Sequence, residues 1–349
     1  PIRWLTTGDT AAEALQDNDR IIEAINEKLG IDLTVEIVPE ANTEKVNVAM
    51  ASGDFPDVVT GAYGTSATQQ WIDDGMVIPL NDYMDSFPSM KAWLENYEWS
   101  AQNGKYYGMP FITQYSVANT MIVMRQDWLD NLGLEAPRTW DEMVAVAEAF
   151  VKEDPDGNGE NDTIGILGPA NSDYVNGNGG NRYGLDPLFS AFQSYPKYWL
   201  KDDSGNIVYG SITDETRTAL EKVAGLYADG LIDTEILVRN DSTEPLLSGK
   251  VGIFFGPWWC GYTVGDTILA QEADWQAYFT PLAEDGKFYT HMAEPTSRYV
   301  VASKSCKNPE AAFKIVNYLI KNEQKWVDEG VSTTEMGTAD FYPLYNTYD

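Results

Sequence analysis

The spacing of apolar residues at the start of the chain predicts helices and strands in turn. Apolar side chains at residues 21–29 recur on one face of a helix, which is predicted to end at Gly30. Apolar and polar residues alternate over residues 31–37, as in a strand. A second helix is predicted around residues 46–50, and a turn then leads to a short buried strand at residues 58–59. This order predicts a mainly parallel sheet with helices on both faces.

The same two spacings recur later in the chain. Strands are predicted at residues 120–124, 251–255 and 299–302, and a helix at residues 215–229. Another helix is predicted to begin after Thr139, because Glu142 completes a capping-box pattern. Asn308 and Pro309 indicate the start of a further helix. Residues 171–184 are rich in Asn and Gly and predict a long loop.

The chain has 349 residues, which is typical of two domains of about 100–200 residues each. The predicted fold class is therefore α/β, in more than one domain. In parallel sheets of this class, ligands bind beyond the carboxyl ends of the strands. Residues 60–64 occupy such a place after the predicted strand at 58–59.

The charge balance narrows the classes of partner. The chain has 54 Asp and Glu against 23 Lys and Arg, with a formal net charge of -31. Such a surface repels phosphate backbones, so nucleic acid is not expected as a partner. No apolar run reaches the roughly 18 residues of a membrane span. The chain opens directly on a strand-like pattern, so we expect any targeting segment to have been removed.

The two cysteines, Cys260 and Cys306, are too few for a disulfide framework. They could pair with each other, but small buried thiols are favoured.

Residues 154–162 have the oxygen pattern of an EF-hand loop, with Gly159 at the sharp turn in position 6. The expected calcium ligands are Asp154, Asp156, Asn158, the carbonyl of Glu160, and Asp162. The usual Glu at position 12 is replaced by Gly165. The alternative is a solvated turn that binds no metal. With one such loop, a structural calcium ion is a better expectation than a calcium sensor.

Five short stretches occur in a recognisable order. They are SGDFPDVV at residues 52–59, GKYYGMP at 104–110, RQDWL at 125–129 with TWDE at 139–142, GKVG at 249–252 with GPW at 256–258, and NPEAA at 308–312. Each stretch is weak alone, but the ordered set resembles the extracellular solute-binding proteins of the first carbohydrate-binding family. A calcium loop just after the helix that begins at Thr139 is a further resemblance, to the Gram-positive lipoprotein branch of that family.

The resemblance implies a periplasmic-binding-protein-like fold of two lobes with a hinge and an interlobe cleft. The implied lobes are residues 1–112 with 299–320, and residues 113–298 with 321–349. It also implies an extracellular, monomeric protein, held on the cell membrane by an N-terminal lipid that precedes these residues. Its relatives continue beyond the C-terminus, so we expect the second lobe to be shortened.

The resemblance further implies the function of the binding component of an ABC importer. Such a component captures a carbohydrate, here expected to be an oligosaccharide, and delivers it to the transmembrane subunits of the permease. No enzymatic activity is implied.

A sugar site needs flat aromatic rings for the C–H faces and polar side chains for the hydroxyl rim. Trp258 is the first choice, because it follows a buried strand and a Gly-Pro turn, and the family implies a stacking role there. The other aromatic candidates are Tyr63, Tyr115, Trp71 and Trp259, and the polar candidates are Asn171, Glu294 and Arg298. For each of them, core packing or an ordinary surface role is the alternative.

The sequence leaves further functions open. His291 is the single histidine, so a histidine metal cluster is excluded, and no nucleophile elbow or phosphate loop occurs. A glycosidase needs only two carboxylates about 5–10 Å apart, which the sequence cannot exclude. The pattern is also compatible with a binder of peptides or acidic solutes and with a calcium-dependent adhesion protein. Sugar turnover would identify the enzyme, and loss of binding on chelation would identify the adhesion protein.

Overall fold

The computed structural model describes residues 1–8, 20–39, 48–49, 52, 55–61, 64–111, 120–170, 175, 183–257, 260, 273–279, 283–290, 296 and 298–329. These residues form two compact units. Unit 1 comprises the described residues of 1–113 and 295–349, and unit 2 comprises those of 114–294. The chain passes from unit 1 into unit 2 and returns, which is the connectivity of a two-lobed periplasmic-binding-protein-like fold.

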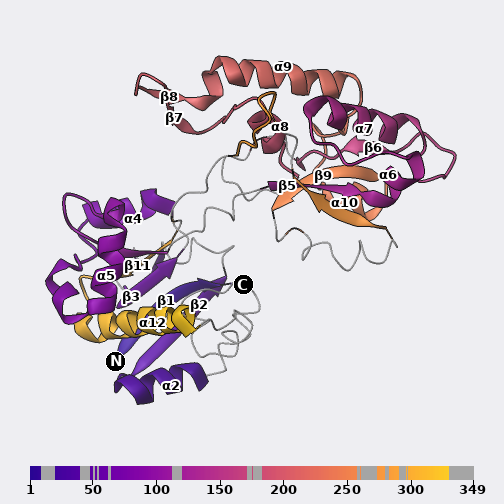
Figure 1. The fold of residues 1–349 in the computed structure, drawn as a ribbon. Coiled ribbons are helices and arrows are strands. Elements are labelled where there is room, and N and C mark those ends of the chain that lie inside the picture. Colours follow the sequence, from indigo (N-terminus) through magenta and orange to yellow (C-terminus); the bar gives the residue numbers. More distant parts are fainter. Residues whose placement is uncertain are drawn as a thin grey trace. The chain divides into compact units, whose positions relative to one another are not determined.

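Unit 1 contains a five-stranded sheet in the order β2-β1-β3-β11-β4 (Figure 1). Its strands are β1 (Ile2–Gly8), β2 (Leu33–Pro39), β3 (Val58–Gly61), β4 (Gly108–Phe111) and β11 (Arg298–Ala302). The first three strands are parallel, as predicted, but β11 is antiparallel to both β3 and β4. The sheet is therefore mixed, because the returning chain inserts β11 between two strands of the first segment.

Helices cover this sheet. They are α2 (Arg20–Leu29), α4 (Gly64–Asp73), α5 (Pro88–Asn96) and α12 (Pro309–Glu329), with short 3-10 helices η2 (Asn81–Ser86) and η3 (Glu98–Ser100). The Asn317 side chain of α12 accepts hydrogen bonds from the backbone N–H groups of Ser89 and Met90, at 2.9 and 3.1 Å. These bonds satisfy the start of α5, where backbone donors have no partner within the helix.

The core of unit 1 forms where helices α5 and α12 pack on the sheet. Trp4 of β1 is 1% exposed, and its indole N–H donates to the hydroxyl of Thr60 on β3 at 2.8 Å. Phe313 of α12 is buried against the ring of Tyr83, with ring centroids 4.8 Å apart. A returning segment thus completes the hydrophobic core that the first segment begins.

The expected boundary between the lobes after residue 320 falls inside helix α12. The second lobe was expected to take over after residue 320, but α12 continues without a break to Glu329 within unit 1. The described residues 321–329 therefore belong to unit 1. The apolar stripe that packs on the sheet ends near Ile320, and an unbroken helix carries the following residues with it.

Unit 2 contains a four-stranded sheet in the order β10-β5-β9-β6. The strands are β5 (Thr120–Arg125), β6 (Ile164–Ile166), β9 (Val251–Pro257) and β10 (Trp275–Tyr278). Strand β9 is parallel to β6 and antiparallel to β5, and every residue of β9 is buried. A separate hairpin is formed by β7 (Trp199–Lys201) and β8 (Ile207–Tyr209).

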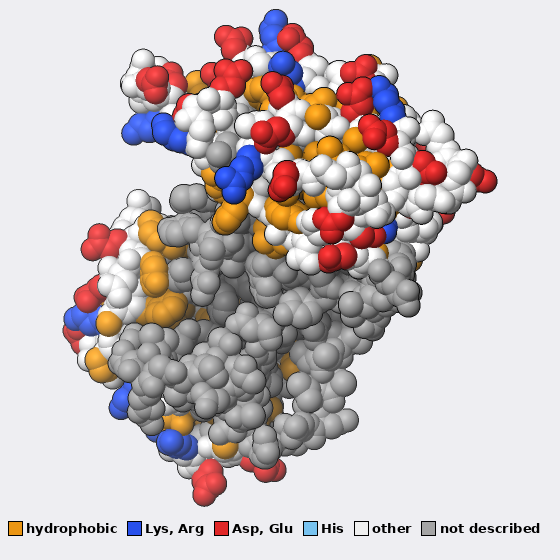
Figure 2. All heavy atoms as spheres, turned by 45° about the vertical axis from the view of Figure 1, so that its right-hand side comes forward, with side chains coloured by type: hydrophobic (Ala, Val, Ile, Leu, Met, Phe, Trp, Pro, Cys, Tyr) orange, Lys and Arg blue, Asp and Glu red, His pale blue; other side chains and the backbone are white. Residues whose placement is uncertain are grey.

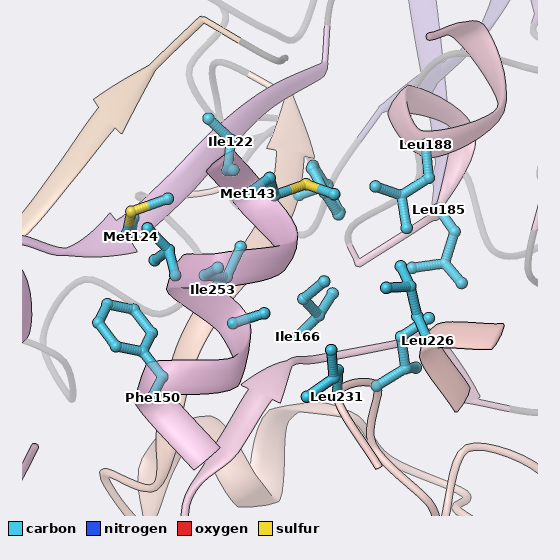
Figure 3. Packing of buried hydrophobic residues seen from close by; sticks show 14 of the residues in the cluster. Ile122, Met124, Met143, Phe150, Ile166, Leu185, Leu188, Leu226, Leu231 and Ile253 are labelled. Atoms are coloured by element: carbon cyan, nitrogen blue, oxygen red, sulfur yellow. The ribbon is translucent and has the colours of Figure 1, made fainter. Parts of the chain in front are cut away.

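Five helices surround this sheet in the described part of unit 2: α6 (Gln126–Leu132), α7 (Trp140–Lys152), α8 (Asp186–Ser190), α9 (Asp214–Ala228) and α10 (Thr243–Leu247), with the 3-10 helix η6 (Gly210–Ile212). Figure 3 shows Met143 and Phe150 of α7 facing Ile253 of β9 and Met124 of β5. Gly252 permits this close packing, because a Cβ there would lie 2.2 Å from the ring of Phe150.

Several predicted elements agree with the structure. Helix α7 begins after Thr139, whose hydroxyl accepts from the N–H of Glu142 while the Glu142 carboxylate accepts from the N–H of Thr139. Helix α9 lies within one residue of its predicted ends. The predicted helix at 46–50 and the predicted loop at 171–184 lie largely outside the described residues.

Neither cysteine is in a disulfide. Cys260 is buried in unit 2 and Cys306 in unit 1, and burial raises the pKa of the Cys306 thiol to about 11. None of the described helices is long and apolar enough to cross a lipid bilayer. Acidic side chains are spread over the described residues on the face shown in Figure 2, which fits the net charge of -31.

Candidate functional site

The predicted calcium loop joins the end of helix α7 to strand β6. Its backbone turns through left-handed conformations at Asp154, Gly157 and Gly159, with φ values of 47, 69 and 77°. Glycine adopts this conformation readily, so the two glycines suit the turn, and Asp is among the few other residues that tolerate it.

The loop's acidic and amide side chains converge. Both carboxylate oxygens of Asp154 accept backbone hydrogen bonds, from Asn158 at 3.1 Å and from Gly159 at 3.0 Å. The Asn158 amide NH2 donates to Asp156 at 3.0 Å and to Asp162 at 3.1 Å. All four predicted ligand side chains, those of Asp154, Asp156, Asn158 and Asp162, are thus linked in one cluster of hydrogen bonds.

The crowding of acidic side chains and their hydrogen bonds shift the pKa values of two aspartates in the loop. Desolvation, a hydrogen bond with Asp154, and the negative charges of Asp154 and Asp162 raise the pKa of Asp156. A hydrogen bond from the Lys250 ammonium and another from the Asn158 amide lower the pKa of Asp162. Lys250 therefore neutralises part of the loop's negative charge.

Hydrogen bonds fasten the loop region to helices α6 and α7. The side-chain amide of Asn131, on α6, donates to the carbonyl of Pro155 at 3.1 Å. The Thr163 hydroxyl donates to the carbonyl of Phe150, on α7, at 2.6 Å. A change of loop conformation would therefore act on the packing of both helices.

No side chain could complete the usual EF-hand pattern at position 12. A Cβ at Gly165 would lie 2.8 Å from the carbonyl oxygen of Leu231 and 2.9 Å from that of Ala147. Strand β6 has to pass close to these groups, which explains the departure from the standard loop.

The donor chemistry nevertheless fits a hard cation. Three carboxylates, one amide and one backbone carbonyl are oxygen ligands of the kind that calcium prefers, and water can supply the rest. No group of three or more His, Cys, Asp or Glu side chains is already arranged around a metal position in the described ranges. The Asn158 amide would have to turn its oxygen toward the ion, which a rotation of that side chain achieves.

Of the eight predicted sugar-binding residues, the structure describes only Trp71 and Arg298. The other six lie outside the described residues: Tyr63, Tyr115, Asn171, Trp258, Trp259 and Glu294. Along the chain, Tyr63 follows the end of β3 and Trp258 follows the end of β9. Arg298 is the first residue of β11, in register with Phe111 of β4.

Trp71 lies on α4 and is only 6% exposed. It packs in an apolar cluster with Leu5, Val59 and Val301 on the sheet of unit 1. This burial favours the core role that the sequence left open over a stacking role toward a sugar.

The sequence pattern did not indicate one residue that contacts the loop. Lys250 precedes β9, far from the loop along the chain, yet its Nζ lies 2.6 Å from a carboxylate oxygen of Asp162. Only the parallel pairing of β6 with β9 brings the two together. No local spacing signal could have shown this contact.

The chain is similar in sequence to three curated proteins. It is 28% identical over 243 residues to the polygalacturonan/rhamnogalacturonan-binding protein YtcQ of Bacillus subtilis, covering 68% of this chain and 46% of YtcQ. It is 29% identical over 248 residues to the lipoprotein LipO of the same organism, covering 69% and 47%. It is 27% identical over 274 residues to the fructooligosaccharide ABC transporter substrate-binding protein FusA of Streptococcus pneumoniae, covering 73% and 49%. The chain thus spans about half the length of these relatives.

Solved structures share its fold. FusA in complex with kestose superposes with a TM-score of 0.69 at 22% identity, over 91% of this chain and 66% of FusA. A FusA EF-hand mutant in complex with fructo-nystose gives the same values.

The sequence profile of one family matches residues 6–326, which is most of the chain. The chain therefore belongs to the family of bacterial extracellular solute-binding proteins.

Proposed function

We propose that this protein is the extracellular binding component of an ABC importer and that it captures an oligosaccharide. The observation that carries the proposal is the family match over residues 6–326, on a chain that folds as two α/β units. Similarity to proteins named as binders of polygalacturonan and of fructooligosaccharide supports a saccharide ligand. FusA is named as the substrate-binding protein of an ABC transporter, which favours binding without catalysis over the glycosidase alternative.

In this proposal, the sugar lies in a cleft between the lobes. Trp258 stacks on a sugar face, with Tyr63, Tyr115 and Trp259 nearby, and Asn171, Glu294 and Arg298 hydrogen-bond the hydroxyl rim. Apolar stacking supplies affinity, and the polar groups supply specificity, since a missing hydroxyl would leave a buried polar group unpaired.

Closure of the lobes on the ligand is the second part of the proposal. A ligand that bridges both lobes binds the closed state more tightly than the open state and so shifts the population toward closure. The permease would recognise the closed form. We propose that the protein acts as a monomer and is held on the outer face of the cell membrane by a lipid, as the lipoprotein relative suggests.

The test is a binding screen by thermal melting and calorimetry. The panel contains neutral fructooligosaccharides, oligogalacturonides and short peptides. We expect a neutral oligosaccharide to raise the melting temperature, because a net charge of -31 opposes the approach of an anionic ligand. A response to peptides alone would contradict the proposal. Release of product from an oligosaccharide would replace it with an enzymatic function.

We further propose that the loop at residues 154–162 binds a structural calcium ion. Asp154, Asp156, Asn158 and Asp162 would hold it through side-chain oxygens, and Glu160 through its carbonyl. The support is the donor chemistry, the left-handed glycines, and the similarity to FusA, for which an EF-hand mutant has been solved. The ion would supply charge neutralisation and hold the end of α7 against β6.

A further inference from the structure

Lys250 reaches the calcium loop because of the sheet of unit 2. Strand β6 pairs with β9 in parallel, with Ile164 in register with Val251. The N–H of Ile164 donates to the carbonyl of Lys250 at 2.7 Å, which extends the ladder to the last residue before β9. The end of the loop and Lys250 are therefore neighbours on adjacent backbones.

The ammonium group of Lys250 occupies a ligand oxygen. Its Nζ lies 2.6 Å from one carboxylate oxygen of Asp162, and the Asn158 amide donates to the other at 3.1 Å. Both oxygens of the position-9 carboxylate are thus held by hydrogen-bond donors. A divalent ion on the same carboxylate would lie close to the ammonium, so the two positive charges compete for Asp162.

Lys250 also responds to the charge of the whole loop. Its ammonium feels the negative charges of Asp162, Glu160 and Asp156. Within the described residues, it is the one Lys or Arg side chain that forms an ion pair with the loop. Lys250 therefore supplies a positive charge beside the four acidic side chains of the loop, which are Asp154, Asp156, Glu160 and Asp162.

The position of Lys250 allows exchange. Its side chain is 44% exposed and that of Asp162 is 24% exposed, so the ammonium can leave for water and lose only the small free energy of a partly exposed ion pair. A divalent ion bound among the same acids would repel the ammonium and favour this movement.

We propose that Lys250 is a built-in competitor for calcium: its ammonium neutralises the loop when calcium is scarce and, as a positive charge beside Asp162, opposes the binding of the ion. Lys250 thereby sets the calcium concentration at which the loop fills. This inference rests on the calcium site of the proposed function, and it adds a residue that is not itself a ligand.

The test is the calcium affinity of the full chain, measured by calorimetry at moderate ionic strength for four proteins. Lys250→Met removes the charge and keeps most of the side-chain length. Lys250→Arg keeps the charge. Lys152→Met is the matched control. Lys152 lies at the end of α7, the helix that leads into the loop, and it forms an ion pair with Glu148 of that helix and not with a loop residue.

We expect Lys250→Met to bind calcium about 3- to 30-fold more tightly than the wild type, judged from a unit charge a few ångströms from the ion in a partly solvated site. Lys250→Arg and Lys152→Met should match the wild type within about twofold. Added KCl should shrink the difference between Lys250→Met and the wild type, because salt screens the charge that was removed.

A second readout does not depend on calcium affinity. In EGTA, Lys250→Met should melt below the wild type, since four acids then lack their counterion, and saturating calcium should remove that difference. If Lys250→Met does not fold, Lys250→Gln takes its place.

Calcium binding by the wild type with equal or weaker binding by the uncharged variants would overturn this inference alone. A wild type that does not bind calcium would overturn the calcium proposal and this inference together. The binding of oligosaccharide would be untouched by either result.

Discussion

At the scale of single residues, the local chemistry of the chain is set by close approaches. Gly165 and Gly252 each stand where a Cβ would meet another atom at less than 3 Å, so the sheet of unit 2 can pack tightly. Asp162 is shared between an amide and an ammonium group. Trp71 is buried on the sheet of unit 1, where an aromatic side chain adds core area.

Trp258 carries the residue-scale prediction for sugar binding. Trp258→Ala should weaken oligosaccharide binding by roughly 1–3 kcal/mol, the value of burying one large apolar side chain. Calorimetry measures this change. The control is Trp199→Ala, because Trp199 is 72% exposed on the β7–β8 hairpin. Equal affinity for wild type and Trp258→Ala would remove Trp258 from the site.

At the scale of elements, helix α7 links a capping box at its start to the candidate calcium loop at its end. The two hydrogen bonds between Thr139 and Glu142 satisfy backbone donors that the helix itself cannot pair. The face of α7 that packs on β9 supplies Met143, Ala147 and Phe150 to the core. Helix α7 therefore connects the loop directly to the core of unit 2.

The cap predicts a measurable stability effect. Thr139→Ala should lower the free energy of unfolding by about 1 kcal/mol, since a backbone N–H of the first turn loses its acceptor. Thr139→Ser keeps the hydroxyl and should stay close to the wild type. Urea unfolding of both variants measures the difference, and equal losses would show that the methyl group of Thr139, and not the cap, is what matters.

At the scale of the whole molecule, two units built on separate sheets share one chain that crosses between them. Acids outnumber bases strongly, which fits the proposed role outside a cell and the proposed calcium site. A calcium ion bound to unit 2 would act on stability by mass action, because only the folded loop brings its oxygens together.

Calcium should therefore raise the melting temperature of the protein. At a tenfold to hundredfold excess over Kd, the stabilisation is about 1.4–2.7 kcal/mol. EGTA should reverse it, and Asp156→Ala should melt at a lower temperature than the wild type in calcium and lose the response to chelator. Thermal melting with and without EGTA measures this. A wild type indifferent to EGTA would contradict the calcium site.

The sequence alone determined those features that depend on neighbouring residues. Helical and strand spacing, the capping box at Thr139 and Glu142, and the oxygen spacing of residues 154–162 are all local patterns, so each could be read without knowing the fold. The order of five short motifs was enough to indicate the family, because order along the chain survives when the identity of other residues is lost.

Only the tertiary structure decided what depends on residues far apart in the chain. The insertion of β11 between β3 and β4, the continuation of α12 within unit 1, and the burial of Trp71 each follow from packing against distant segments. The contact of Lys250 with Asp162 has the same origin, since it exists because β6 and β9 are paired. Sheet pairing brings together residues with no local relation, and so no spacing along the sequence predicts the chemistry that results.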